Sequence, residues 1–183
     1  HPLEGSWENL QIMNTEICIN KLMGKYKYVA IFDYDEYLVP WSKISLPEML
    51  TTMERKAKHD IHKLPNSFRF KSAFFYPVSA AKKGSMYIIE STYRTNYCIG
   101  RYKYIVRPEG VQEARVHDAL CLGSSSKSYE VDPKMCLLNH IRRDKSHLKG
   151  KSLHSDNSIG RLFKPKLVNS ALYKVFKEHD FIA

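Results

Sequence analysis

An apolar run, Val29 to Phe32, is followed at once by three acidic residues: Asp33, Asp35 and Glu36. Strands that are buried on both faces of a sheet are continuous runs of such apolar residues. Ionised carboxylates at the end of a buried strand are costly unless a positive group holds them. The stretch therefore predicts a buried strand whose acidic loop either lies in solvent or binds a cation.

Apolar residues at helical spacing predict three helices in this chain. Ser6 is a plausible N-cap for the first helix and Gly24 a plausible stop, while Ser45 and Pro47 open the second. The third lies near residues 167–176. The inward-facing residues would be Leu10, Met13 and Ile17 in the first helix, Leu46, Met49, Leu50 and Met53 in the second, and Val168, Leu172 and Val175 in the third.

Short segments rich in aromatic and β-branched residues predict further strands. They are SFRFKSAFFY (67–76), YKYIVRP (102–108), EARVHDAL (113–120) and MCLLNHI (135–141). Helices early and strands later indicate an α/β or α+β chain, and no stretch reads as a linker. We therefore expect residues 1–183 to form a single domain.

Composition excludes some classes of protein. No stretch approaches the roughly 18 apolar residues of a membrane span. The net charge of +10 would suit nucleic acid, an anionic membrane or a phosphate-bearing substrate, but the basic residues are dispersed and no nucleic-acid module accompanies them. The four cysteines, Cys18, Cys98, Cys121 and Cys136, have no CxxC spacing, which argues against zinc and leaves free thiols and disulfides both open.

The acidic loop is compatible with three kinds of site. Two carboxylates two residues apart can bind a divalent cation that in turn holds a diphosphate. In a phosphatase of the haloacid-dehalogenase type, Asp33 would be the nucleophile and Asp35 the general acid, but Tyr37 stands where that family expects Thr or Val. The third possibility is a solvated acidic turn at the edge of the sheet.

Longer motifs favour the first kind of site. KYKYVAIFDYDEYLVP (25–40) resembles the signature of glycosyltransferase family 92, formerly domain of unknown function 23, and the preceding helix resembles the segment before that signature. RYKYIVRPEGVQEARVH (101–117) is similar to a second family motif. LLNHIRRDKSHLKGK (137–151) matches a third more loosely, with Ile141 where Tyr is usual. The motifs occur in the family's order across roughly residues 10 to 150.

The resemblance implies a GT-A-like mixed sheet with flanking helices and an inverting transfer of galactose from UDP-galactose, the UDP-sugar donor, to a glycan acceptor. It implies Mn²⁺ as cofactor, with Asp33 and Asp35 as the DxD carboxylates of the metal site and Asp35 favoured over Asp33 as the direct ligand. Glu36 would be a hydrogen-bond acceptor behind the metal shell. Family members are usually type II membrane proteins of the Golgi lumen, so membrane attachment would come from an anchor outside this chain.

Further residues follow from the resemblance. A histidine from a later strand would complete the metal site, either His117 or His140. The general base would be Glu90, with Asp118 in reserve. The remaining candidates are Arg101, Lys103 and Arg107 for the UDP diphosphate, and Tyr37 and Trp41 for stacking on sugar or uracil.

One departure from the family pattern concerns the donor pocket. GT-A domains hold the nucleotide with a βαβ half that precedes the DxD motif, and only 32 residues precede Asp33 here. We therefore expect this chain to be the C-terminal portion of an N-terminally truncated domain, weakly active or inactive when isolated. We expect no nucleic-acid partner. The rival hypothesis is a non-catalytic glycan-binding or scaffold protein that retains the fold and binds glycan without metal.

Overall fold

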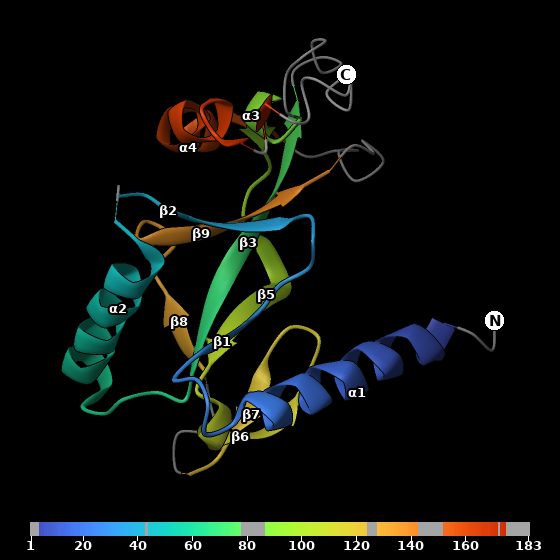
Figure 1. Ribbon diagram of the computed structural model, residues 1–183, viewed down its shortest axis with the longest axis vertical. Helices are drawn as coiled ribbons and strands as arrows, with labels where there is room; N and C mark the ends of the chain where they lie inside the picture. The colour runs from blue at the N-terminus through green and yellow to red at the C-terminus, as the bar shows by residue number, and fades with distance from the viewer. Residues whose placement is uncertain are drawn as a thin grey trace.

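The computed structural model describes residues 4–42, 44–77, 87–123, 128–142, 152–171 and 173–174. They form a curled, mixed eight-stranded sheet with helices around it and a separate two-stranded sheet (Figure 1). The helices are α1 (Glu4–Leu22), α2 (Leu46–Ile61), α3 (Tyr87–Glu90), α4 (Ser158–Val168) and the 3₁₀ turn η1 (Pro108–Gly110). The strands are β1 (Val29–Ile31), β2 (Glu36–Pro40), β3 (Ser67–Pro77), β4 (Ser91–Arg94), β5 (Cys98–Val106), β6 (Val111–Ala114), β7 (Ala119–Cys121), β8 (Tyr129–Val131), β9 (Cys136–Ile141) and β10 (His154–Ser155). The predicted α/β class is confirmed.

The long strand β3 is the centre of the large sheet. It pairs antiparallel with β5 and β4, and parallel with β8 and β9. β1 then pairs with β5, β2 with β9, and β10 with β4. β1 and β2 thus lie in different parts of the sheet, and the acidic loop that joins them runs from one part to the other (Figure 1).

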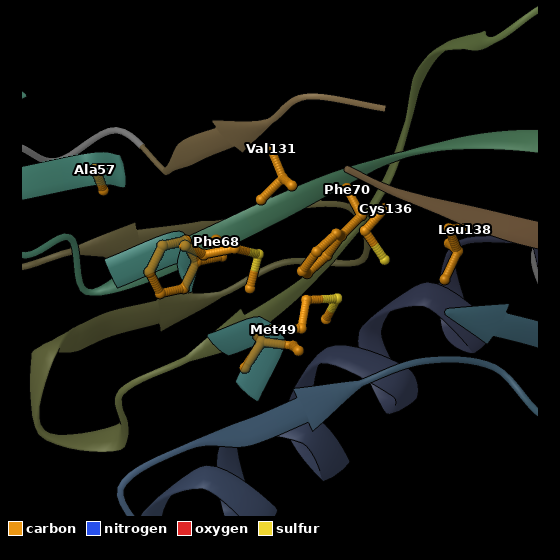
Figure 2. Packing of buried hydrophobic residues seen from close by; sticks show 9 residues of the cluster. Met49, Ala57, Phe68, Phe70, Val131, Cys136 and Leu138 are labelled. Atoms are coloured by element: carbon orange, nitrogen blue, oxygen red, sulfur yellow. The ribbon is translucent and has the colours of Figure 1, made fainter. Parts of the chain in front are cut away.

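Helix α2 covers one face of this sheet and buries the largest apolar cluster. Met49, Met53 and Ala57 of α2 pack on Phe68 and Phe70 of β3 (Figure 2), and all five are fully buried. The helix begins as predicted, because Ser45 and Glu48 form a reciprocal capping box. Burying each large side chain contributes about 1.5–3 kcal/mol. Leu46 differs from the prediction and is 44% exposed.

Helix α1 differs from the prediction in its start and its inner face. It begins at Glu4, so Ser6 lies inside the helix and is not its N-cap. Leu10, Met13 and Ile17 are exposed, and the helix contacts the domain through Ile19 and Leu22 instead. Helical spacing shows that such residues share a face, but not that this face is covered. The stop at Gly24 is confirmed, since its φ of 71° is one that glycine adopts without strain.

Two later segments also differ from the prediction. The stretch 113–120 is a hairpin of β6 and β7, because the chain reverses between Ala114 and Ala119. Helix α4 begins at Ser158, nine residues before the predicted segment, and Pro165 lies inside it. Within the predicted segment, the described residues Ala171, Tyr173 and Lys174 are helical as well, so the predicted helix is confirmed in part. Of its predicted inner face, Val168 is half-buried, while Leu172 and Val175 lie outside the described residues.

All four cysteines lie in the described part of the chain, and all four are free thiols. Cys18 is exposed and Cys98 half-buried, whereas Cys121 and Cys136 are buried. The question that the sequence left open is therefore answered in favour of thiols. Among the described helices, none is long and apolar enough to cross a membrane.

Truncating the centre of the α2 cluster should destabilise the domain strongly. Phe70→Ala removes a fully buried ring and leaves a cavity, so the free energy of unfolding should fall by about 3–5 kcal/mol. Urea denaturation followed by circular dichroism measures this loss. Ile99→Ala is the control, because Ile99 is 96% exposed and should change stability by less than about 0.5 kcal/mol. Equal effects of the two substitutions would contradict this assignment of the core.

The thiols should differ in reactivity in the native protein. Burial raises the pKa of Cys121 to about 11 and also raises that of Cys136, so both remain unreactive thiols at neutral pH. Iodoacetamide should label Cys18 first and Cys98 more slowly, and Cys121 and Cys136 only in denaturant. Mass spectrometry of tryptic peptides reads out each site. Native labelling of Cys136 as fast as Cys18 would refute the packing described here.

Candidate functional site

The acidic loop is a tight turn between β1 and β2. The Glu36 amide donates to the Asp33 carbonyl at 3.1 Å, and the Asp33 amide donates to Oε2 of Glu36 at 2.9 Å. The Asp35 carbonyl accepts from the amide of Ile141 in β9 at 2.9 Å, which fixes the turn to a second strand. The three carboxylates are therefore gathered by backbone geometry rather than spread along a strand.

His140 contacts two of these carboxylates. Its Nε2 lies 3.2 Å from Oδ2 of Asp35, and its Nδ1 lies 3.4 Å from Oε1 of Glu36. The strand register explains this, because Glu36 of β2 stands directly opposite His140 of β9. Burial and the neighbouring Arg142 lower the pKa of His140, which favours the neutral imidazole that metals bind.

Lys103 of β5 contacts the other side of the loop. Its Nζ lies 3.0 Å from Oδ2 of Asp33 and 3.8 Å from Oε2 of Glu36, and its side chain is 1% exposed. Asp33 also accepts from Nε2 of Gln11 in α1 at 3.2 Å. Burial raises the pKa of Glu36 to about 7, although the Asp33 amide and Lys103 act in the opposite direction.

The site lies at the border of the α2 core. Side chains two residues apart on a strand share a face. His140 therefore follows Leu138 of that core along β9, and Lys103 precedes Ile105 along β5. The same sheet face is thus apolar beneath α2 and charged next to it; Figure 1 shows β2 and β9 side by side beyond the end of α2.

An aromatic ring with two guanidinium groups borders the histidine. The rings of Phe74 and His140 are 5.1 Å apart, in an edge-to-face arrangement. The guanidinium carbons of Arg101 and Arg142 lie 5.8 Å and 5.5 Å from the centre of the Phe74 ring. Arg142 also approaches Oδ2 of Asp35 at 4.0 Å. Two positive groups thus lie beside the Asp35–His140 pair.

His117 and Arg107, which were also predicted as site residues, have different surroundings from the Asp35–His140 pair. His117 bonds the Tyr102 carbonyl through Nδ1 at 3.1 Å, and Asp33 and Lys103 are close enough to shift its pKa, which burial lowers overall. Arg107 follows β5 at the end that pairs with the start of β1, away from the acidic loop.

The predicted general bases and stacking residues have separate environments. Asp118 accepts from Arg69 at 3.3 Å and from Ser128, and Glu90 ends α3 immediately before β4. Trp41 donates to the Pro133 carbonyl at 2.6 Å and packs on an apolar cluster, whereas Tyr37 is 40% exposed. Tyr37 is the more exposed of these two, since Trp41 is half-buried.

Gln11, Phe74 and Arg142 lie at the site but were not predicted from the sequence. Arg142 falls within the third family motif, two residues after His140, so alternation along β9 was an available signal. No signal in the sequence marked Gln11 or Phe74, because their contacts at the site depend on how α1 and β3 pack.

The donor set determines which metal site the residues offer. No group of three or more His, Cys, Asp or Glu side chains among the described residues is arranged to hold a metal ion. Asp35 and His140 form a pair of one oxygen and one nitrogen donor, and Asp35 is 25% exposed. A cation that takes one or two protein ligands and completes its shell with substrate phosphates and water fits this pair.

Comparison with known proteins identifies the family. A model of glycosyltransferase family 92 matches residues 6–176, nearly the whole chain. The chain therefore belongs to glycosyltransferase family 92 and is a glycosyltransferase, which implies a sugar donor and a glycan acceptor. No curated protein gives a significant match.

Proposed function

We propose that this chain is a metal-dependent, inverting galactosyltransferase that uses UDP-galactose and Mn²⁺ in the Golgi lumen. The observation that carries the proposal is the 3.2 Å contact between Asp35 and His140 at the end of the acidic loop. Family membership supports transfer of a sugar, and this pair supports a cation as the means of holding its diphosphate.

Glu36 supports a metal-binding role for His140. Histidines that bind metals usually donate their second ring N–H to a carboxylate, which fixes the ring orientation. Glu36 Oε1 lies 3.4 Å from Nδ1 of His140, while Nε2 faces Asp35. The row of Glu36, His140 and Asp35 thus has the order expected for such a site.

Asp35 and His140 would hold the cation, and a bound divalent cation neutralises charge on the departing diphosphate. Arg101 and Arg142 flank the same place and would bind the diphosphate through charge-assisted hydrogen bonds. Phe74 positions both guanidinium groups, because each lies over its ring.

An inverting transfer also needs a base that removes the proton from the acceptor hydroxyl as this oxygen attacks the anomeric carbon. Asp118 accepts from Arg69 and Ser128. Glu90, with Asp118 in reserve, stays the predicted base. Tyr37 follows Glu36 on β2 and therefore faces the opposite side of the sheet from Glu36 and His140, so it does not lie beside the proposed cation site.

Asp35→Asn should abolish Mn²⁺-dependent binding of UDP without unfolding the chain. The substitution keeps the side-chain shape but removes the anionic donor beside His140. Calorimetric titration of UDP and UDP-galactose, in Mn²⁺ and then in EDTA, measures the effect. The native chain should bind only when Mn²⁺ is present.

Asp132→Asn is the matched control for this experiment. Asp132 is an exposed acid in the turn before β9, where it accepts from the amide of Lys134. Its substitution should leave UDP binding unchanged. Retention of Mn²⁺-dependent binding in Asp35→Asn would reject the proposed site.

Substitution of each candidate histidine should change Mn²⁺-dependent UDP binding to a different extent in the same titration. His140→Asn should reduce Mn²⁺-dependent UDP binding by at least about tenfold, as is typical when a metal ligand or its supporting group is lost. His117→Asn should have a smaller effect, because His117 bonds the Tyr102 carbonyl. The reverse ranking would assign the metal to the Asp33 side of the loop.

A further inference from the structure

A buried lysine lies against the acidic loop. The Lys103 side chain is 1% exposed, on the central part of β5, where it pairs with Phe70 of β3. Its Nζ is 3.0 Å from Asp33 and 3.8 Å from Glu36. It therefore approaches the carboxylates from inside the domain.

An ammonium group in such a place depends on its anionic neighbours. A buried charge is costly unless it is paired. Asp33 and Glu36 supply that pairing, so their charges are already compensated within the fold. Asp33 is further held by Gln11, and Glu36 by His140 and the Asp33 amide. Asp35 makes no contact with Lys103 and faces His140 and Arg142 instead.

We propose that Lys103 is a positioning residue that keeps Asp33 and Glu36 away from the cation, so that Asp35 and His140 alone receive it. The cation then binds together with the nucleotide diphosphate rather than before it. This inference rests on the proposed function and adds to it the order of assembly at the site.

Charge balance explains the coupling between cation and nucleotide. Asp35 offers one negative charge to a divalent cation, and Arg101 and Arg142 add positive charge nearby. A diphosphate relieves this excess, so each ligand strengthens binding of the other. If Asp33 were free, the loop would offer a second carboxylate, and the cation would bind without the nucleotide.

The first test measures binding of Mn²⁺ alone, from the electron paramagnetic resonance signal of the free ion. The native chain should bind Mn²⁺ weakly, and UDP should increase the affinity at least tenfold. Lys103→Met should bind Mn²⁺ alone about tenfold or more tightly than the native chain, because it frees Asp33 and removes a positive charge. In this variant, UDP should increase the Mn²⁺ affinity by a smaller factor than it does in the native chain.

A gain of metal affinity separates positioning from a merely structural role, because a variant that only loosens the fold would lose affinity. Lys71→Met is the matched control, since Lys71 pairs with Glu130 at 3.0 Å on the neighbouring strand and contacts none of the loop carboxylates. It should leave Mn²⁺ binding unchanged. Unchanged Mn²⁺ affinity in a folded Lys103→Met would overturn the proposal.

Asp33→Asn provides a test if Lys103→Met does not fold. The Asp33 side chain is 41% exposed, and Glu36 stays 3.8 Å from the Lys103 ammonium as its remaining anionic neighbour, so the variant should fold. Because Lys103 withholds Asp33 from the cation, Asp33→Asn should retain Mn²⁺-dependent UDP binding, whereas Asp35→Asn loses it. Equal loss in the two variants would overturn the inference.

Failure of this inference differs from failure of the proposed function. A native chain that binds no UDP under any condition would reject the function, while a gain of Mn²⁺ affinity in Lys103→Met would still support the role of Lys103. Tight binding of Mn²⁺ to the native chain without UDP would reject the inference and leave the proposed function intact.

Discussion

The buried ion pair between Lys103 and the acidic loop is the constraint on which the site depends. It joins β5, in the interior of the sheet, to the turn that leaves β1 and enters β2. Charged groups at this depth persist only as a set, since removing one partner leaves another uncompensated. The turn therefore has a defined conformation, and Asp35 extends from it toward His140.

The position of α2 divides this sheet face into two chemical regions. Where α2 packs, the alternating side chains of β3, β5 and β9 are Phe68, Phe70, Ile105 and Leu138. Beyond the helix, the same strands present Phe74, Lys103 and His140. The candidate site is thus a continuation of the core face, and the rigidity of the core is transmitted to it through shared strands.

Local sequence signals predicted the parts of the fold whose cause is local. The start of α2 at Ser45 and the end of α1 before Gly24 depend on nearby residues, and both were predicted correctly. The exposed stripe of Leu10, Met13 and Ile17 was predicted wrongly, because burial depends on which elements pack there. The pairing of β2 with β9, which brings Glu36 to His140, is likewise a long-range contact that the pattern of neither strand encodes.

The acidic motif shows the same limit within a few residues. The spacing of the acids does not by itself distinguish Asp33 from Asp35, since both are carboxylates in one short loop; only the family resemblance favoured Asp35. Their environments separate them: Asp33 turns to a lysine and a glutamine, and Asp35 to an imidazole and a guanidinium. Asp33, which is held by a buried lysine, is a structural element, whereas Asp35, on a partly exposed edge beside an imidazole, is the proposed ligand of the cation. The strands that surround the loop therefore determine the different environments of Asp33 and Asp35, and the spacing of the acids does not.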